Sequence, residues 1–182
     1  MMKLCGGGRY RYLMTYTFGI TITMFLSTFE LRSQVPPQEV APPPLKTISK
    51  EETDRLASIR DVKRRTQTAL NMMSARLKNA EGFVGKDQHD EVYRELGAFH
   101  GLMDNTLEFL DGSDRDSNKV LNNYKRFEMG LRQFRPRLEL IRREIPLNYE
   151  PYVRNLIGYL RDTRAKAVEP MFGDTVAPRT KP

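Results

Sequence analysis

The fold is decided by residues 120–145, which read VLNNYKRFEMGLRQFRPRLELIRREI. Large apolar side chains recur in this stretch in steps of four and three residues, at Val120, Tyr124, Phe127, Leu131, Phe134, Leu138, Ile141 and Ile145. This spacing places all eight on one face of an α-helix. Burying eight such side chains contributes roughly 12 to 24 kcal/mol of gross transfer free energy, but only if other apolar surfaces cover them. The rest of the chain is therefore expected to supply helices that pack against this one.

A proline at position 136 interrupts the pattern. Proline inside a helix removes a backbone hydrogen bond and crowds the preceding turn. The apolar spacing nevertheless keeps its phase from Phe134 to Leu138, so we expect one kinked helix rather than two. In this phase Leu131 is buried and Arg132 faces water. An exposed Leu131 would instead indicate half of an intermolecular coiled coil.

A first helix is predicted to begin at Ser49, because Ser49 and Glu52 fit the capping-box pattern. We expect it to continue without a break to Gly82 or Gly85. Its inner positions are Leu56, Ile59, Val62, Thr66, Leu70, Met73, Leu77 and Ala80.

Two more helices follow from the same periodicity. One is predicted to be capped by Asp87 and to end at Asp111-Gly112, with inner residues Val92, Leu96, Phe99, Met103, Leu107 and Leu110. The other opens near residues 148–151 and should end at Pro170, with inner residues Val153, Leu156, Ile157, Leu160 and Ala167. The predicted fold class is all-α. Short connections favour an antiparallel bundle of about four helices over residues 49–169.

The N-terminus has the layout of an export segment. Residues 12–29 contain no charged side chain, and Lys3, Arg9 and Arg11 precede them. We predict a signal peptide or an uncleaved membrane anchor over residues 1–34. Either alternative places the domain outside the cytoplasm, as a periplasmic, secreted or membrane-anchored protein. A cytosolic protein with an incidental apolar run is the third alternative.

Residues 35–48 contain five prolines and are predicted to be a Pro-rich linker, either a stiff spacer or a disordered connector. Residues 170–182 are predicted to be a flexible tail. The single cysteine, Cys5, lies in the N-terminal segment, so the domain has no internal disulfide and no thiolate metal site.

Charge is distributed unevenly along the chain. Residues 49–81 sum to +3, residues 82–118 to −6 and residues 119–168 to +7. One interpretation is complementarity between helices of the bundle. The other is an anionic partner, such as lipid headgroups, a cell-wall polymer or an acidic protein. The candidate contacts are Arg132, Arg135, Arg142, Arg143, Arg154, Arg161 and Arg164.

The membrane is a partner through residues 12–29 if the segment is not cleaved. No nucleic-acid-binding motif is present, so no nucleic acid is expected unless the protein is not exported. Self-association through the helices stays open.

His100, Asp104 and Glu108 stand one helical turn apart, but a metal site in a bundle needs Glu-x-x-His pairs that this chain lacks. Residues 111–118 look like a calcium loop, yet Lys119 and Lys125 stand where an EF-hand needs glycine and glutamate. We therefore predict no metal and no cofactor.

No catalytic motif is present in the sequence, including G-x-S-x-G, the P-loop and H-E-x-x-H. We predict a non-enzymatic helical bundle with a binding or structural role. The alternatives are a ligand-binding or metal-binding bundle and, without export, a basic protein associated with nucleic acid.

Overall fold

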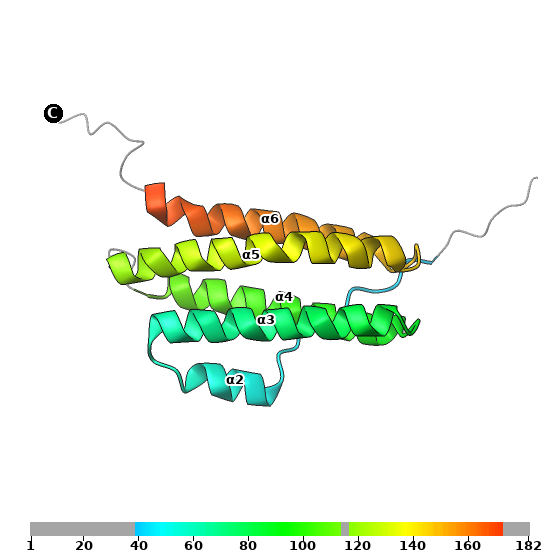
Figure 1. Ribbon diagram of the computed structural model, residues 1–182, viewed down its shortest axis with the longest axis horizontal. Helices are drawn as coiled ribbons and strands as arrows, with labels where there is room; N and C mark the ends of the chain where they lie inside the picture. Colours follow the sequence, from blue (N-terminus) through cyan, green and yellow to red (C-terminus); the bar gives the residue numbers. More distant parts are fainter. Residues whose placement is uncertain (1–38, 114–116, 173–182) are drawn as a thin grey trace, which may run out of the picture. The chain divides into compact units, whose positions relative to one another are not determined.

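The computed structural model describes residues 39–113 and 117–172, which belong to a compact unit that begins at Glu39. These residues form helices and no strand, so the all-α prediction is confirmed. The helices are α2 (Lys50–Ala57), α3 (Val62–Val84), α4 (His89–Asp111), α5 (Asn118–Glu144) and α6 (Glu150–Phe172), arranged as a bundle (Figure 1). The predicted signal or anchor over residues 1–34 lies outside the described residues. Within residues 39–113 and 117–172, no helix is both long and apolar enough to cross a membrane.

The organising helix is α5, and it runs through Pro136 as a single helix. All eight residues of its apolar face are buried, which confirms the predicted phase. Leu131 has no exposed surface, whereas the side chain of Arg132 is 67% exposed. The apolar face of α5 is therefore part of the core of the bundle.

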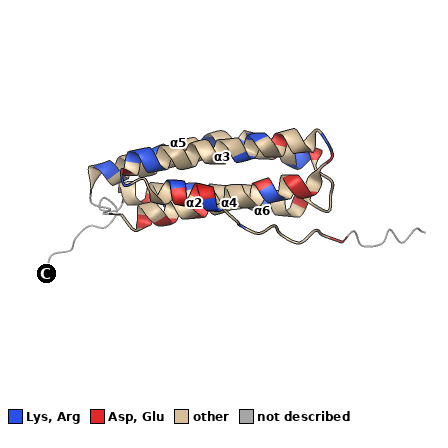
Figure 2. Ribbon diagram, turned by 90° about the horizontal axis from the view of Figure 1, so that it is seen from below, with Lys and Arg blue, Asp and Glu red and all other residues tan. Residues whose placement is uncertain are grey.

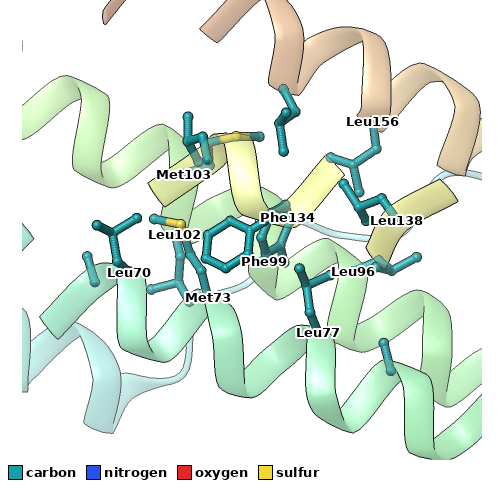
Figure 3. Close-up of a cluster of buried hydrophobic side chains, with 14 of the residues drawn as sticks. Leu70, Met73, Leu77, Leu96, Phe99, Leu102, Met103, Phe134, Leu138 and Leu156 are labelled. Carbon is teal, nitrogen blue, oxygen red and sulfur yellow. The ribbon is translucent and has the colours of Figure 1, made fainter. Parts of the chain in front are cut away.

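The centre of the core is an edge-to-face pair of rings, Phe99 of α4 and Phe134 of α5, whose centroids lie 5.5 Å apart. Figure 3 shows aliphatic side chains from α3, α4, α5 and α6 around this pair, among them Met73, Leu138 and Leu156. The four long helices therefore share one core.

The helices do not surround the core in chain order. The extensive packing is between α3 and α4, α3 and α5, and α5 and α6, whereas α4 and α5 touch only slightly. Two ion pairs, Asp61 with Lys119 and Glu81 with Arg137, show that α3 and α5 run in the same direction. A glycine permits their close approach, because a Cβ at Gly130 would meet the side chain of Leu70 at 2.6 Å. The bundle is thus two helical hairpins joined along α3 and α5 (Figure 1).

The predicted first helix is in fact two helices, α2 and α3, so the described part of the bundle has five helices instead of about four. The capping box at Ser49 is confirmed. The break occurs because the Asp61 carboxylate accepts a hydrogen bond from the backbone N–H of Arg64 at 2.8 Å and starts a new helix. This turn folds α2 back along α3 and buries Leu56.

The prediction that Asp87 caps α4 is wrong. Asp87 has φ 55° and ends α3, because its N–H bonds to the Val84 carbonyl and the N–H of Gln88 bonds to the Phe83 carbonyl. This is the Schellman arrangement, with aspartate where glycine is usual. Gln88 occupies the N-cap of α4 and makes no side-chain capping bond.

Pro170 does not end the last helix, which continues to Phe172. A proline so close to a helix end removes only one backbone hydrogen bond, and the preceding turns are held by packing. The rest of the predicted tail lies outside the described residues.

Candidate functional site

A groove of about 790 Å³ lies between α3 and α5. We call it the α3/α5 groove. Most of the residues that line it have polar side chains, although about half of its surface is apolar. The lining consists of Asp61, Lys63, Gln67, Leu70, Asn71, Ser74, Lys119, Asn122, Asn123, Lys125, Arg126, Met129, Gly130, Gln133 and Phe134. The parallel course of α3 and α5 brings two polar stripes together, one from each helix.

The groove contains more cations than carboxylates. Lys119 lies 2.7 Å from Asp61, and this hydrogen bond, with the N–H of Arg64, holds the pKa of Asp61 below its ordinary value. Lys63, Lys125 and Arg126 form no salt bridge with a carboxylate of the described residues. These three side chains are therefore the cations of the groove that a ligand can engage.

Amide side chains line the groove between the cations. Gln67 donates to Asn71 at 3.2 Å, and Asn123 donates to the carbonyl of Lys119 at 2.7 Å while also accepting from Arg126. Amides offer both donors and acceptors. The described lining has no histidine or cysteine and one acid, Asp61, and its cations and amides offer hydrogen bonds to a ligand.

The field around the groove is positive. Helices α3 and α5 together carry thirteen basic and four acidic side chains, a formal charge of +9. Helices α4 and α6 carry five and nine, a formal charge of −4, and Figure 2 shows the two kinds of charge on the ribbon. Neither α3 nor α5 has an acid in its first turn, although their positive ends lie at the same end of the bundle.

Of the seven arginines predicted to contact an anionic partner, none lines the α3/α5 groove. Five are paired with carboxylates of the bundle, namely Arg132, Arg142, Arg154, Arg161 and Arg164. Arg135 and Arg143 are exposed and have no salt bridge to the described residues. The predicted set is therefore spread along α5 and α6, and most of its members are already paired with carboxylates of the bundle.

Two buried glutamates account for four of these pairs. Glu128 accepts from Arg132 at 3.1 Å and from Arg164 at 2.7 Å. Burial raises the pKa of Glu128, but the hydrogen bonds from both arginines outweigh this effect and hold the pKa below its ordinary value. Glu150 is shared in the same way by Arg142 and Arg154. These pairs fix the register of α5 against α6.

Among the residues that the structure describes, the predicted neutralisation of the basic helices by the acidic second helix is seen at Glu95. Glu95 of α4 is buried and pairs with Arg76 of α3. Among the described residues, the arginines of α5 and α6 pair with acids of α3, α5 and α6. For these arginines, charge complementarity therefore operates mostly within the α5–α6 hairpin.

Sequence reasoning missed Lys63, Lys125 and Arg126. A signal for them is present, because lysine, glutamine, asparagine and serine recur on α3 at positions 63, 67, 71 and 74. A matching stripe of cations and amides occupies positions 119, 122, 126 and 133 of α5. Only the parallel packing of α3 and α5 shows that the two stripes face one groove.

His100 and Asp104 come together, but Glu108 is exposed and does not join them. The His100 Nε2 atom lies 3.8 Å from Asp104, which also accepts from Tyr159 at 2.5 Å and from Lys46 at 2.9 Å. Across residues 39–113 and 117–172, no group of three or more His, Cys, Asp or Glu side chains is close enough to hold a metal ion.

Comparison with known proteins gives no relative: no protein-family model, no curated protein and no solved structure matches this chain.

Proposed function

We propose that this protein is a non-enzymatic binding module whose α3/α5 groove takes a ligand bearing phosphate or carboxylate groups. The observation that carries the proposal is the presence of Lys63, Lys125 and Arg126 on one groove without carboxylate partners among the described residues. Several arginines elsewhere in the bundle, such as Arg137 and Arg164, are instead paired with glutamates.

The physical reason is electrostatic. Like charges that line one groove repel one another, and the positive ends of α3 and α5 add to the potential. A bound anion relieves this repulsion and accepts charge-assisted hydrogen bonds, which are stronger than neutral ones. The repulsion between the cations of the groove is thus unfavourable in the free protein and is relieved when an anionic ligand binds.

The shape and the amides indicate a ligand larger than a simple ion. A volume of about 790 Å³ is within the range of small-molecule sites. The amides of Asn71, Asn122 and Gln133 offer hydrogen bonds to neutral groups of the ligand, while the cations engage its charged groups. We therefore favour a ligand with at least two anionic groups separated by polar, uncharged groups.

A titration of the full chain with tripolyphosphate and with citrate tests the proposal by calorimetry. The variant Lys125→Gln/Arg126→Gln should bind at least about tenfold more weakly, because two charge-assisted contacts are lost. The matched control is Arg135→Gln/Arg143→Gln, which removes the same charge from exposed positions of α5 outside the groove. Equal weakening in both variants would show that net charge, and not the groove, attracts the anion.

The site of action is a separate part of the proposal. Residues 1–34 support an extracytoplasmic location, with the bundle either secreted or tethered to the membrane. Alkaline phosphatase fused after residue 45 should be active outside the cytoplasm. An inactive fusion would contradict export and would favour the alternative of a basic protein associated with nucleic acid.

The charge of α3 and α5 is the observation that favours this second candidate. Duplex DNA would then bind with an affinity that falls steeply with salt and is insensitive to sequence. Duplex DNA binding should then be weakened as much by the control variant as by the groove variant. That result would support this candidate over the groove ligand.

A further inference from the structure

Residues 41–48 lie against the bundle as an extended segment, which we call the strap. The Ala41 N–H donates to the carbonyl of Asn148 at 2.9 Å, and Ile48 packs against the core. Between these ends the strap crosses α4. The described part of the predicted Pro-rich linker thus contacts the bundle at Ala41 and at Ile48, while most of the side chains between them are exposed.

Two glycines of α4 make room for the strap. A Cβ at Gly101 would lie 2.7 Å from the carbonyl oxygen of Lys46, and a Cβ at Gly97 would overlap that of Leu45. The strap backbone therefore lies directly against α4 at both glycines, and these contacts define the position of the strap.

One ion pair fastens the strap at its middle. Lys46 Nζ donates to Asp104 Oδ2 at 2.9 Å and lies 5.0 Å from the centroid of the Tyr159 ring. The second oxygen of Asp104 accepts from Tyr159 at 2.5 Å. Asp104 therefore joins the strap to α4 and α6.

His100 lies beside this fastening. Its side chain is 9% exposed, and its Nε2 atom has no hydrogen-bond partner although it is 3.8 Å from Asp104. Its ring packs at a tilt of 50° against the ring of Tyr159, with centroids 4.4 Å apart, and its Nδ1 atom is 3.4 Å from the Tyr152 hydroxyl. The charged and titratable groups that face His100 are thus Asp104 of α4, Lys46 of the strap, and Tyr152 and Tyr159 of α6.

We propose that the strap is a pH-sensitive element, held on α4 while His100 is neutral and released when His100 is protonated. A proton on Nε2 places a positive charge beside Asp104, where it competes with Lys46 for the carboxylate and repels the Lys46 ammonium. Apart from the ion pair, the strap is held mainly at its ends, where Ala41 and Ile48 pack against the core. Loss of the ion pair therefore frees the segment between them.

The sign of the pH dependence follows from burial. Burial lowers the pKa of His100 below its ordinary value of 6.5; Asp104 opposes this effect and Lys46 adds to it. Burial raises the pKa of Tyr152 and of Tyr159, so both stay neutral in this range. Detachment of the strap removes Lys46 from the neighbourhood of His100 and so raises the pKa of His100 toward 6.5, and acid therefore favours the detached state.

Distance measurements between spin labels test the proposal in the full chain. With Cys5→Ser, labels at Leu45→Cys and Arg161→Cys report the strap against α6, and both native side chains are exposed. We expect one narrow distance distribution at pH 8 and a broad one at pH 5. Labels at Arg132→Cys and Arg161→Cys report the bundle alone and should stay narrow at both pH values.

Two variants assign the change to His100. His100→Phe keeps the ring contact without a titrating nitrogen, and the strap distribution should stay narrow at pH 5; His100→Gln is the second neutral replacement. Gly101→Ala should give the broad distribution at both pH values. The proposal is overturned if the wild type stays narrow at pH 5, if a neutral replacement broadens with acid as the wild type does, or if the bundle pair broadens too.

Discussion

Arg76 of α3 and Glu95 of α4 form a two-oxygen contact, in which the arginine Nη1 lies 3.1 Å from each carboxylate oxygen. The same guanidinium donates to Glu52 of α2 at 2.7 and 3.0 Å, so one side chain joins three helices. Asn79 donates to Glu95 at 3.2 Å and completes its hydrogen bonding.

Replacing Arg76 tests this junction. Arg76→Met leaves the buried Glu95 without a cation and should lower the free energy of unfolding by about 1 to 3 kcal/mol, measured by urea denaturation. Arg94→Met is the control, since Arg94 is exposed on α4, and should change stability by less than about 0.5 kcal/mol. Equal effects would mean that Arg76 acts only as a surface charge.

The core packing of α5 gives a second prediction. Leu131→Ala should cost about 2 to 5 kcal/mol, because it empties a fully buried leucine site. Arg132→Ala should change stability by only about 0.5 kcal/mol, because its partner Glu128 keeps Arg164. A silent Leu131→Ala in chemical denaturation would contradict the assignment of α5 to the core.

Replacing two helical glycines by alanine should change the stability of the protein in opposite directions. Gly82→Ala places its Cβ in open space in α3 and should stabilise the protein by about 0.5 to 1 kcal/mol through helix propensity. The Cβ of Gly97→Ala would overlap the strap backbone, so this variant should lower the free energy of unfolding of the protein by roughly 1 to 3 kcal/mol. Thermal melts of both variants check this. A stabilising effect of Gly97→Ala would show that the strap does not lie against α4.

Acid should weaken the contact between α5 and α6. Because the pKa of Glu128 is depressed in the folded state, its ion pairs add stability that is fully present above pH 4.5, the ordinary value, and is lost as the pH falls through the folded pKa. Glu128→Gln should thus be less stable than the wild type at pH 7, and the difference should shrink below pH 4.5. The measurement is urea denaturation, and a stability difference between wild type and variant that is constant from pH 7 to pH 3 would exclude this linkage. Glu144 is exposed on the same helix, so Glu144→Gln controls for the lost charge.

The interior of the fold was predictable because apolar periodicity records burial directly. The faces of α4 and α5 are correct at every position, from Val92 to Leu110 and from Val120 to Ile145. The errors concern local backbone alternatives. Asp61 begins a new helix by accepting one backbone bond, and Asp87 takes a left-handed conformation that glycine usually supplies. Neither choice changes the apolar pattern, so the pattern could not reveal it.

The groove was not predictable, because its residues become neighbours only through the lateral pairing of α3 with α5. Chain order favours contact between consecutive helices, whereas α4 and α5 barely touch. Two of the arginines predicted from the sequence, Arg154 and Arg164, are paired with a glutamate one turn away and with a glutamate on the facing helix, respectively. Net charge along a segment therefore says little about which cations a partner can reach.

The arrangement of the hairpins also bears on how the molecule can be divided. Residues 39–113 contain α2, α3 and α4, and residues 117–172 contain α5 and α6, so each half is contiguous and its internal contacts are local. The halves meet chiefly along α3 and α5, and little packing depends on the covalent link between α4 and α5. The two halves therefore have the geometry for fragment complementation: two separate polypeptides could reassemble the bundle, with the groove forming only where they join.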